Sequence, residues 1–308
     1  MGVYKLSFVI PCYKSSLTIE GVVKEIQSVI LSLEISSYEI ILVNDGSPDD
    51  VWDKIQQLSG DDRIIGINLS RNFGQHAALL AGYASASGDL VVSLDDDGQT
   101  PIEELQKLLC KIDEGYDVVY AYYDEIKQNG FRRFGSWMAN KMSHVFIGSP
   151  KDFKGSSFYV AKKYIIEEIV RYNYPYPYLF GLVYRTTHSV GNVLTHHRKR
   201  VSGQSGYTFK TLMKLWMNGF TAFSVKPLRI GTCMGVVTSA FGFVVAMIIV
   251  IRKIINPDIA AGWSSTISII MIIGGLILVM LGLLGEYIGR IYICINKTPQ
   301  YVIKEKIN

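Results

Sequence analysis

Residues 88–101, GDLVVSLDDDGQTP, join a short apolar strand to a run of carboxylates. The β-branched segment Leu90–Leu94 is typical of a strand that is buried on both faces. Three acidic residues follow it directly: Asp95, Asp96 and Asp97. Like charges this close raise one another's pKa unless a cation neutralises them, and hard oxygen ligands suit Mg²⁺ or Mn²⁺. The stretch predicts a divalent-metal site at a strand end, with a solvated acidic turn before the helix near Pro101 as the alternative.

The first 160 residues or so repeat this pattern of strand and helix. Further strands are predicted at Leu6–Ile10, Glu39–Val43, Arg63–Asn68 and Asp117–Tyr120. Helices are predicted between the strands, at Thr18–Leu33, Asp49–Leu58, Gln75–Ser85 and Ile102–Glu114. This alternation indicates an α/β fold with a mainly parallel sheet and helices on both faces. Because such sheets bind ligands beyond the carboxyl ends of their strands, the acidic run lies where chemistry is expected.

Two other strand ends carry polar or aromatic residues at the same predicted edge. The first strand leads into Pro11-Cys12-Tyr13, and the second leads into Asn44-Asp45-Gly46-Ser47. No Gly-x-Gly-x-x-Gly motif follows any strand, and the sequence contains no Walker P-loop. Their absence argues against a dinucleotide-binding Rossmann site and against a P-loop NTPase.

Two apolar runs near the C-terminus make the composition of the chain unusual. It is 49% hydrophobic and 19% charged, against about 25% charged residues in an average soluble domain. Residues 230–251 and 263–285 contain no charge. A bilayer core about 30 Å thick requires roughly 20 apolar helical residues. We therefore expect two transmembrane helices, about 230–251 and 263–287, with two buried helices of a large soluble core as the alternative.

The loop Arg252–Gly262 is short, so the two helices are expected to form an antiparallel hairpin whose ends share one side of the membrane. Within that loop only Arg252 and Lys253 are basic. More basic residues flank the hairpin: Lys210, Lys214, Lys226, Arg229, Arg290, Lys297, Lys304 and Lys306. The positive-inside rule then predicts a multi-pass protein of the inner (cytoplasmic) membrane, with its N-terminal domain and both termini in the cytoplasm. Residues 1–11 do not resemble a signal peptide.

The cysteines and the net charge exclude other kinds of site. The four cysteines are scattered without metal-ligand spacing, at Cys12, Cys110, Cys233 and Cys294. A cytoplasmic setting predicts that their thiols are reduced. The formal net charge of +4 suits a surface that lies against an anionic leaflet. Because no nucleic-acid recognition motif occurs, we expect no nucleic-acid partner.

Five motifs follow one another in the N-terminal part. They are Phe8-Val9-Ile10-Pro11-x-Tyr13, VNDGS at 43–47, LSRNFGQH at 69–76, Gly88-Asp89-Leu90 and Asp95-x-Asp97-x-Gln99-x-Pro101. In this order they resemble the family 2 glycosyltransferases of GT-A fold. Within that family the chain is similar to the polyprenyl-phosphate glycosyltransferases, including bactoprenol glucosyltransferases and undecaprenyl-phosphate 4-deoxy-4-formamido-L-arabinose transferases. Segments 203–207, 223–229 and 284–290 also fit these two subgroups, which carry a two-helix membrane hairpin.

The resemblance implies a nucleotide-sugar site at the strand ends. Its residues would be Pro11, Tyr13, Asp45, Arg71, Asp95, Asp96 and Gln99. The first three would line the pocket for base and ribose, Arg71 would reach the diphosphate, and Asp95 would face ribose or sugar. Asp97, with Asp95, would hold Mg²⁺ or Mn²⁺ and act in catalysis. Asp96 fills the variable middle position, where a solvated neighbour is the alternative.

One position departs from the family pattern. Many relatives carry Asn-Glu after the tyrosine of the first motif, whereas this chain has Lys14-Ser15. A base contact from that position is therefore left open. His76 stays outside the predicted catalytic set, because a lone histidine is more often a packing or hydrogen-bonding residue.

The resemblance also implies a lipid phosphate as the acceptor. Its predicted contacts are Arg132, Arg133, Arg200 and Ser205. Guanidinium groups bind phosphate oxygens in bidentate fashion, with a generic juxtamembrane basic patch as the alternative. Residues 200–205 match the family's Arg-x-x-Gly-x-Ser pattern, although Gly206 replaces the usual lysine. Asp152 would serve as a base or acceptor-orienting residue, with a structural turn as the alternative.

Residues 207–229 form a further predicted element. Large apolar side chains recur there at three- and four-residue intervals, with Lys210 and Lys214 off that stripe. The pattern predicts an amphipathic juxtamembrane helix in the headgroup plane, with an ordinary core-facing helix as the alternative. The predicted organisation is a GT-A domain over 1–206, this helix over 207–229, the hairpin over 230–289 and a cytoplasmic tail over 290–308.

These observations predict a membrane-anchored, metal-dependent, inverting hexosyl or aminopentosyl transferase. It would move a sugar from a nucleotide donor, with a UDP-sugar as first choice, to undecaprenyl phosphate, for modification of a cell-envelope glycan or lipid. One alternative is a non-catalytic membrane protein that binds nucleotide sugars. Another is a processive polysaccharide synthase, although the Gln-x-x-Arg-Trp motif of those enzymes is missing. Glycine pairs in the spans, at 231 and 235 and at 274 and 275, would permit close helix packing and a homo-oligomer.

Overall fold

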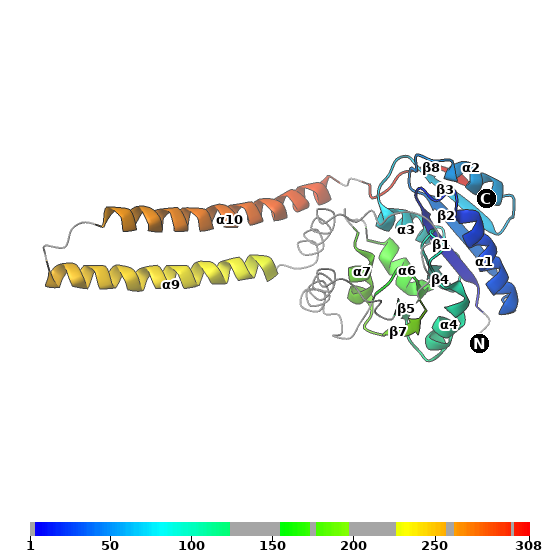
Figure 1. Ribbon diagram of the computed structural model, residues 1–308, viewed down its shortest axis with the longest axis horizontal. Coiled ribbons are helices and arrows are strands. Elements are labelled where there is room, and N and C mark those ends of the chain that lie inside the picture. The colour runs from blue at the N-terminus through cyan, green and yellow to red at the C-terminus, as the bar shows by residue number, and fades with distance from the viewer. Residues whose placement is uncertain (1–3, 124–154, 173–176, 197–225, 257–261, 297–298) are drawn as a thin grey trace. The chain divides into compact units, whose positions relative to one another are not determined.

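The computed structural model describes residues 4–123, 155–172, 177–196, 226–256, 262–296 and 299–308. The chain divides into two units. The first comprises Met1–Leu212 together with Lys297–Asn308, and the second comprises Met213–Asn296. The chain therefore leaves the first unit ahead of the apolar hairpin and returns to it afterwards (Figure 1).

The first unit is built on an eight-stranded sheet in the order β7-β5-β6-β4-β1-β2-β3-β8. The strands are β1 (Leu6–Cys12), β2 (Tyr38–Asn44), β3 (Ile64–Leu69), β4 (Leu90–Ser93), β5 (Val118–Tyr123), β6 (Tyr159–Lys162), β7 (Val190–Thr195) and β8 (Ile303–Ile307). β1 is parallel to β2 and β4, β2 is parallel to β3, and β5 is parallel to β7. β6 runs antiparallel between β4 and β5. The predicted mainly parallel sheet is confirmed.

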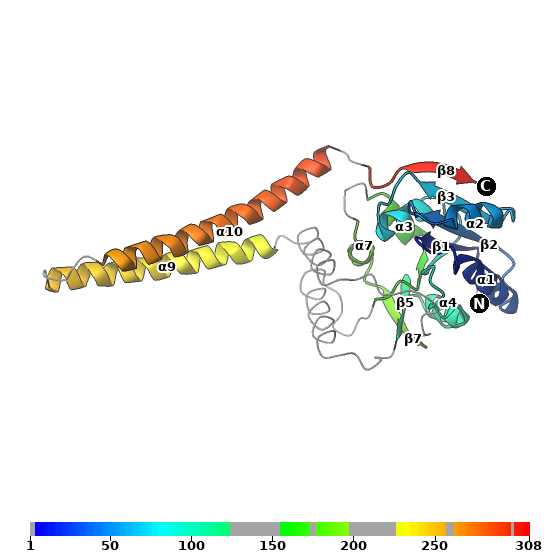
Figure 2. The same cartoon turned by 45° about the horizontal axis from the view of Figure 1, so that its top comes forward.

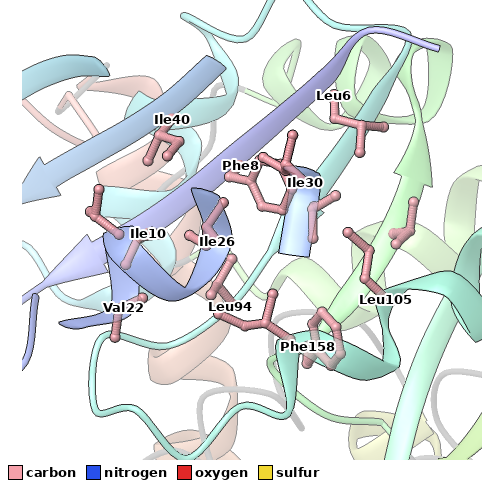
Figure 3. Packing of buried hydrophobic residues seen from close by; sticks show 14 of the residues in the cluster. Leu6, Phe8, Ile10, Val22, Ile26, Ile30, Ile40, Leu94, Leu105 and Phe158 are labelled. Atoms are coloured by element: carbon pink, nitrogen blue, oxygen red, sulfur yellow. The ribbon is translucent and has the colours of Figure 1, made fainter. Parts of the chain in front are cut away.

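Helices cover both faces of this sheet, as predicted. They are α1 (Ile19–Ser32), α2 (Val51–Leu58), α3 (Gln75–Tyr83), the 3₁₀ helix η1 (Ile102–Glu104), α4 (Leu105–Asp113), α6 (Lys163–Val170) and α7 (Leu179–Thr186). One face forms a buried cluster in which β1 side chains meet α1 and α4 (Figure 3). On the other face α3 lies so close that a Cβ on Gly82 would stand 2.3 Å from Cγ1 of Val9.

This two-sided packing buries both sets of alternating β1 side chains. Leu6, Phe8 and Ile10 are at most 1% exposed and face the α1 cluster. Val9, which is also fully buried, points to the opposite face toward α3. Because successive side chains of a strand alternate between faces, only a strand covered on both sides is apolar throughout.

Three strands were not predicted: β6, β7 and β8. β6 is only four residues long, and β8 reads IKEKI with mostly exposed side chains. β8 nevertheless pairs antiparallel with β3, and Figure 2 shows it at that edge of the sheet. The predicted tail over 290–308 thus contains the last turns of a helix and an edge strand. Its backbone hydrogen bonds form without an apolar side-chain pattern, which is why periodicity did not reveal it.

The second unit contains the two long helices α9 (Lys226–Ile255) and α10 (Trp263–Ile295). Segments Gly231–Ile248 and Ile272–Ile295 are long and apolar enough to cross a membrane. The helices contact each other, and a Cβ on Gly231 would stand 2.4 Å from Sδ of Met280. The other glycines of the predicted pairs are Gly235, Gly274 and Gly275. Among the described residues, none of these has a neighbouring heavy atom within 4 Å of a Cβ position. Gly231 is therefore the member of those pairs that permits close packing within the hairpin.

The buried carboxylate of Glu39 links the amino ends of β1, β2 and β4 by hydrogen bonds. Glu39, 8% exposed, accepts hydrogen bonds from Oγ of Ser7 at 2.5 Å and from N and Oγ of Ser87 at 2.6 and 2.8 Å. Nζ of Lys5 lies 3.4 Å away. Burial by itself would raise the pKa of Glu39, but the hydrogen bonds from Ser7 and Ser87 and the charge of Lys5 outweigh it, so the pKa is lowered. The ionised form therefore stabilises the fold.

We predict that Glu39→Gln destabilises the protein at neutral pH by about 1–3 kcal/mol, because a charged acceptor of three hydrogen bonds is lost. A lowered folded-state pKa contributes stability above the unfolded value of about 4.3, and this is lost as the pH falls through the folded value. The Tm difference between wild type and variant, measured on purified full-length protein, should shrink as the pH drops from 7 to below about 4. Glu34→Gln, at an exposed position, is the control. An equal difference at both pH values would contradict the prediction.

Candidate active site

The parallel strands bring four polar loops to one edge of the sheet. Strand register pairs Cys12 with Asn44 and Asn44 with Asn68, so β1, β2 and β3 end side by side. Nδ2 of Asn44 also donates to Oδ1 of Asn68 at 2.9 Å. β4 lies on the other side of β1, with Ser93 opposite Val9. The loops that follow these strands contain nearly all the described residues predicted for nucleotide-sugar binding.

Asp45 joins the loop after β2 to the loop after β3. Its side chain, 3% exposed, accepts hydrogen bonds from N of Phe73 at 2.7 Å and from N of Gly74 at 2.9 Å. Burial raises the pKa of Asp45, and the two backbone donors offset only part of that increase. The Asp45 carboxylate therefore fixes the backbone of residues 73 and 74.

Gly46 lets these two loops touch. Its φ is +59°, and a Cβ there would lie 2.4 Å from the carbonyl carbon of Arg71 and 2.5 Å from N of Asn72. No side chain fits between the loops, and a left-handed φ favours glycine. The backbone before Phe73 is consequently pressed against the end of β2, directly beside Asp45.

Arg71 is carried by that loop and lies at the surface. Its guanidinium carbon stands 4.5 Å from the centre of the Phe73 ring. A cation over an aromatic face is attracted by the ring quadrupole, which favours one orientation of the long side chain. A positive charge is thereby held at the carboxyl edge of the sheet, where a phosphate would be attracted.

The acidic run after β4 is bound into the surrounding loops. Oδ1 of Asp95 accepts from Nε2 of Gln75 at 2.8 Å, and its Oδ2 accepts from Oγ of Ser157. Oδ1 of Asp97 accepts from the backbone N of Gln99 at 3.0 Å. Gly98, between Asp97 and Gln99, has a φ of +71°, which only a residue without a Cβ adopts readily. The two outer carboxylates are thus positioned by separate contacts.

Asp96 is partly exposed and is bound to the loop after β1. Its Oδ2 accepts a hydrogen bond from the backbone N of Tyr13 at 2.9 Å, and its backbone O accepts from Oγ1 of Thr18. Burial raises the pKa of Asp96 to about 6, and the charge of Asp95 adds to the increase. β1 and β4 are neighbours in the sheet, which brings the loops after them into contact.

The loop after β1 presents an aromatic side chain. Tyr13 is 44% exposed, with Nζ of Lys14 5.5 Å from its ring centre. Lys14 itself has a φ of +58°, and its N donates to Oγ of Ser47 at 2.8 Å. A non-glycine residue in this region costs about 1–3 kcal/mol and persists where the surrounding contacts enforce it. Pro11, by contrast, is buried inside β1 opposite Val43.

Several predicted residues lie outside the described part of the chain. They are Arg132, Arg133, Asp152, Arg200 and Ser205, together with most of the predicted helix over 207–229. Residues 226–229 of that predicted helix belong to the first turn of α9. The described site is therefore the donor half of the predicted active site.

Three site contacts were missed by sequence reasoning: those of Gln75, Ser157 and Ser47. Gln75 and Ser157 hold Asp95, and Ser47 holds the backbone of Lys14. Gln75 and Ser47 belong to quoted motifs, so only their roles were missed. Ser157 stands 62 residues after Asp95, on a segment that reaches the site through the unpredicted strand β6. No sequence pattern marked it.

The charges at the end of β4 fit a divalent cation. Asp95 and Asp97 offer hard oxygen donors two residues apart, just after β4. Among the residues that the structure describes, no three His, Cys, Asp or Glu side chains converge on one point. Mg²⁺ and Mn²⁺ do not require such a cage, because they commonly use one or two carboxylates plus substrate phosphates and water.

The mixed sheet with acidic and basic loops at its parallel edge defines a nucleotide-diphospho-sugar transferase fold of GT-A type. The family model for glycosyl transferase family 2 matches residues 7–170, and the model for the GtrB C-terminal hairpin matches residues 226–291. The chain belongs to glycosyl transferase family 2. The GtrB hairpin match coincides with α9 and α10.

Solved structures share this fold at low sequence identity. Glucosyl-3-phosphoglycerate synthase from Mycobacterium tuberculosis, in complex with Mn²⁺, UDP-glucose and glycerol 3-phosphate, has a TM-score of 0.53 at 17% identity. The match covers 71% of this chain and 80% of that one. A mycobacterial protein has a TM-score of 0.52 at 17% identity, with 71% and 74% covered. These similarities establish the fold of the first unit.

We predict that Gly46→Ala destabilises the protein by about 1–3 kcal/mol, because the new Cβ would collide with the Arg71 backbone at a left-handed φ. Gly21→Ala is the matched control. Gly21 lies inside α1 with nothing within 4 Å of a Cβ, so alanine there should stabilise by about 0.5–1 kcal/mol. Thermal unfolding of both purified variants checks the opposite signs. A Gly46→Ala protein as stable as wild type would mean that the two loops can separate freely.

Proposed function

We propose that this protein transfers a sugar from a nucleotide donor to a polyprenyl phosphate, such as undecaprenyl phosphate, at the cytoplasmic face of the membrane. The observation that carries the proposal is the presence in one chain of a family 2 domain and a GtrB-type hairpin. A UDP-sugar is the first donor to test, and modification of a cell-envelope glycan or lipid is the proposed purpose.

The donor half of the reaction depends on charge at the departing diphosphate. When the bond between sugar and diphosphate breaks, negative charge grows on the nucleoside diphosphate. Asp97, with Asp95, would hold Mg²⁺ or Mn²⁺, which supplies electrostatic stabilisation of that charge, and Gln99 would contact the nucleotide sugar. Arg71, exposed above Phe73, would contact the same diphosphate oxygens. Tyr13 and Asp45 would bind the base and ribose beside the buried loop contacts, with Pro11 and Asp96 forming the wall behind them.

The acceptor half needs little proton transfer. A lipid phosphate is already ionised near neutral pH, so one of its oxygens can attack the anomeric carbon directly. The new bond forms as the bond to the nucleoside diphosphate breaks on the opposite face, which inverts the anomeric configuration. In this proposal Arg132, Arg133, Arg200 and Ser205 bind the acceptor phosphate, and Asp152 orients it.

The connectivity of the chain supports a hairpin that enters and leaves the membrane on one side. The first unit contains residues on both sides of the hairpin, because β8 pairs with β3. A chain that crosses the bilayer twice between two parts of one domain must return to the same side. The excess of lysine and arginine outside the loop 252–262 favours the cytoplasm as that side, by the positive-inside rule.

We predict that purified protein with Mg²⁺ or Mn²⁺, a polyprenyl phosphate and a panel of UDP-sugars produces one lipid-linked sugar, detected by mass spectrometry. Asp97→Asn should lower kcat/KM roughly 10²- to 10³-fold, because charge stabilisation at the leaving group is weakened. Asp62→Asn, which neutralises an exposed carboxylate away from the site, should retain activity. Donor binding without turnover would favour the non-catalytic alternative, and a polymeric product would favour a processive synthase.

The membrane orientation gives a separate prediction. In a variant whose four native cysteines are replaced by serine, a cysteine at Asn256, which directly follows α9, should react with a membrane-impermeant maleimide added to intact cells with a permeabilised outer envelope. A cysteine at Leu17, which is 87% exposed in the first unit, should react only after the inner membrane is lysed. Labelling of Leu17→Cys from outside would reverse the proposed topology.

A further inference from the structure

β8, the strand that follows the hairpin, makes its last backbone contact next to the proposed donor site. β8 runs antiparallel to β3, with Ile307 opposite Gly66 and Ile303 opposite Leu69. The register shifts between Asn68 and Leu69. Beyond the last pair, the backbone N of Ser70 donates to O of Val302 at 2.9 Å. Ser70 directly precedes Arg71, so the final contact of β8 adjoins the residue proposed to bind the diphosphate.

The other end of β8 is fixed to the body of the domain. Nδ2 of Asn308 donates to three backbone carbonyls in the turn between α2 and β3: those of Ser59 at 3.0 Å, Asp61 at 3.3 Å and Ile64 at 3.0 Å. The Ile307 side chain packs over Gly66, 3.4 Å from where a Cβ would stand. Before the strand, Nε2 of Gln300 donates to O of Tyr172 at 2.7 Å. β8 is thus held at both ends and along its length.

The loop 70–74 is consequently held from two sides. Asp45 binds the amides of Phe73 and Gly74, and Gly46 is pressed against the backbone of Arg71. On the opposite strand edge, Val302 holds Ser70. A short loop fixed at its start and at its end has few ways to move its middle. Arg71 lies within this loop, so its backbone is fixed before a phosphate binds, and less backbone conformational entropy is lost on binding.

We propose that β8 is a positioning element of the donor site: by holding Ser70 it fixes the loop 70–74 and preorganises Arg71 for the donor diphosphate. The residues that act are Gln300, Val302 and Asn308, none of which would touch the donor. Because residues 296–302 connect α10 directly to β8, the segment that leaves the membrane hairpin is the one that completes the sugar-nucleotide site. This inference rests on the proposed function for the role of Arg71.

Ser70→Pro removes the donated hydrogen bond to Val302, and Ser70→Ala, which keeps the backbone N–H, is the matched control. UDP and uridine are titrated in the presence of Mn²⁺ onto full-length protein in detergent. In Ser70→Pro the Kd for UDP should rise roughly tenfold, while the Kd for uridine changes less than about twofold, because only UDP carries the diphosphate. Ser70→Ala should match wild type for both. An unchanged Kd for UDP, or equal losses for both probes, would overturn the proposal.

If Ser70→Pro fails to fold, a second pair of variants tests whether β8 positions the loop 70–74. Asn308→Ala releases the far end of β8, and Tyr4→Phe removes a remote hydrogen bond to Asp113 as its control. Asn308→Ala should raise the Kd for UDP about threefold and speed amide exchange at Phe73 and Gly74 at least tenfold, whereas Tyr4→Phe should do neither. Unchanged exchange in Asn308→Ala would refute the positioning role. Faster exchange in a protein that binds no nucleoside diphosphate would instead refute the proposed function.

Discussion

The carboxylate of Asp45 is almost fully buried between the ends of two strands. The hydrogen bonds that it accepts determine the shape of this edge of the sheet. Two backbone amides, of Phe73 and Gly74, supply its hydrogen bonds. They can reach Asp45 only because Gly46 carries no side chain that would separate the loops. Leaving a buried carboxylate without donors would cost several kcal/mol, so the loop that carries Arg71 has little freedom to move away.

Much of the donor half could be predicted because parallel strands place their carboxyl ends at one edge of the sheet. The strands that end before Tyr13, Asp45, Arg71 and Asp95 were found from apolar β-branched runs, and their carboxyl ends necessarily meet at one edge. The carboxylates at those ends then indicated metal chemistry, and the resemblance of the ordered motifs to family 2 glycosyltransferases implied the nucleotide site. The apolar runs were recognisable because each of these strands is covered on both faces and is therefore mostly apolar.

The contacts that sequence reasoning missed have a common physical origin in backbone geometry and long-range pairing. Asp96 binds the backbone N of Tyr13, which depends on β4 lying beside β1 rather than on either side chain. Ser157 reaches Asp95 only because β6 runs antiparallel between β4 and β5. Lys14 keeps a left-handed φ where relatives often have Asn, and the contact that holds it comes from Ser47 of another loop. Side-chain patterns carry no information about such pairings.

The same limitation explains β8. Its lysines, glutamate and isoleucines gave the appearance of a charged tail, yet its backbone closes an edge of the sheet that β3 would otherwise leave unpaired. A free tail after the hairpin would supply only an attachment. β8 makes its last backbone contact at Ser70, one residue before Arg71, so under the proposed function the segment that follows the hairpin would also support donor binding.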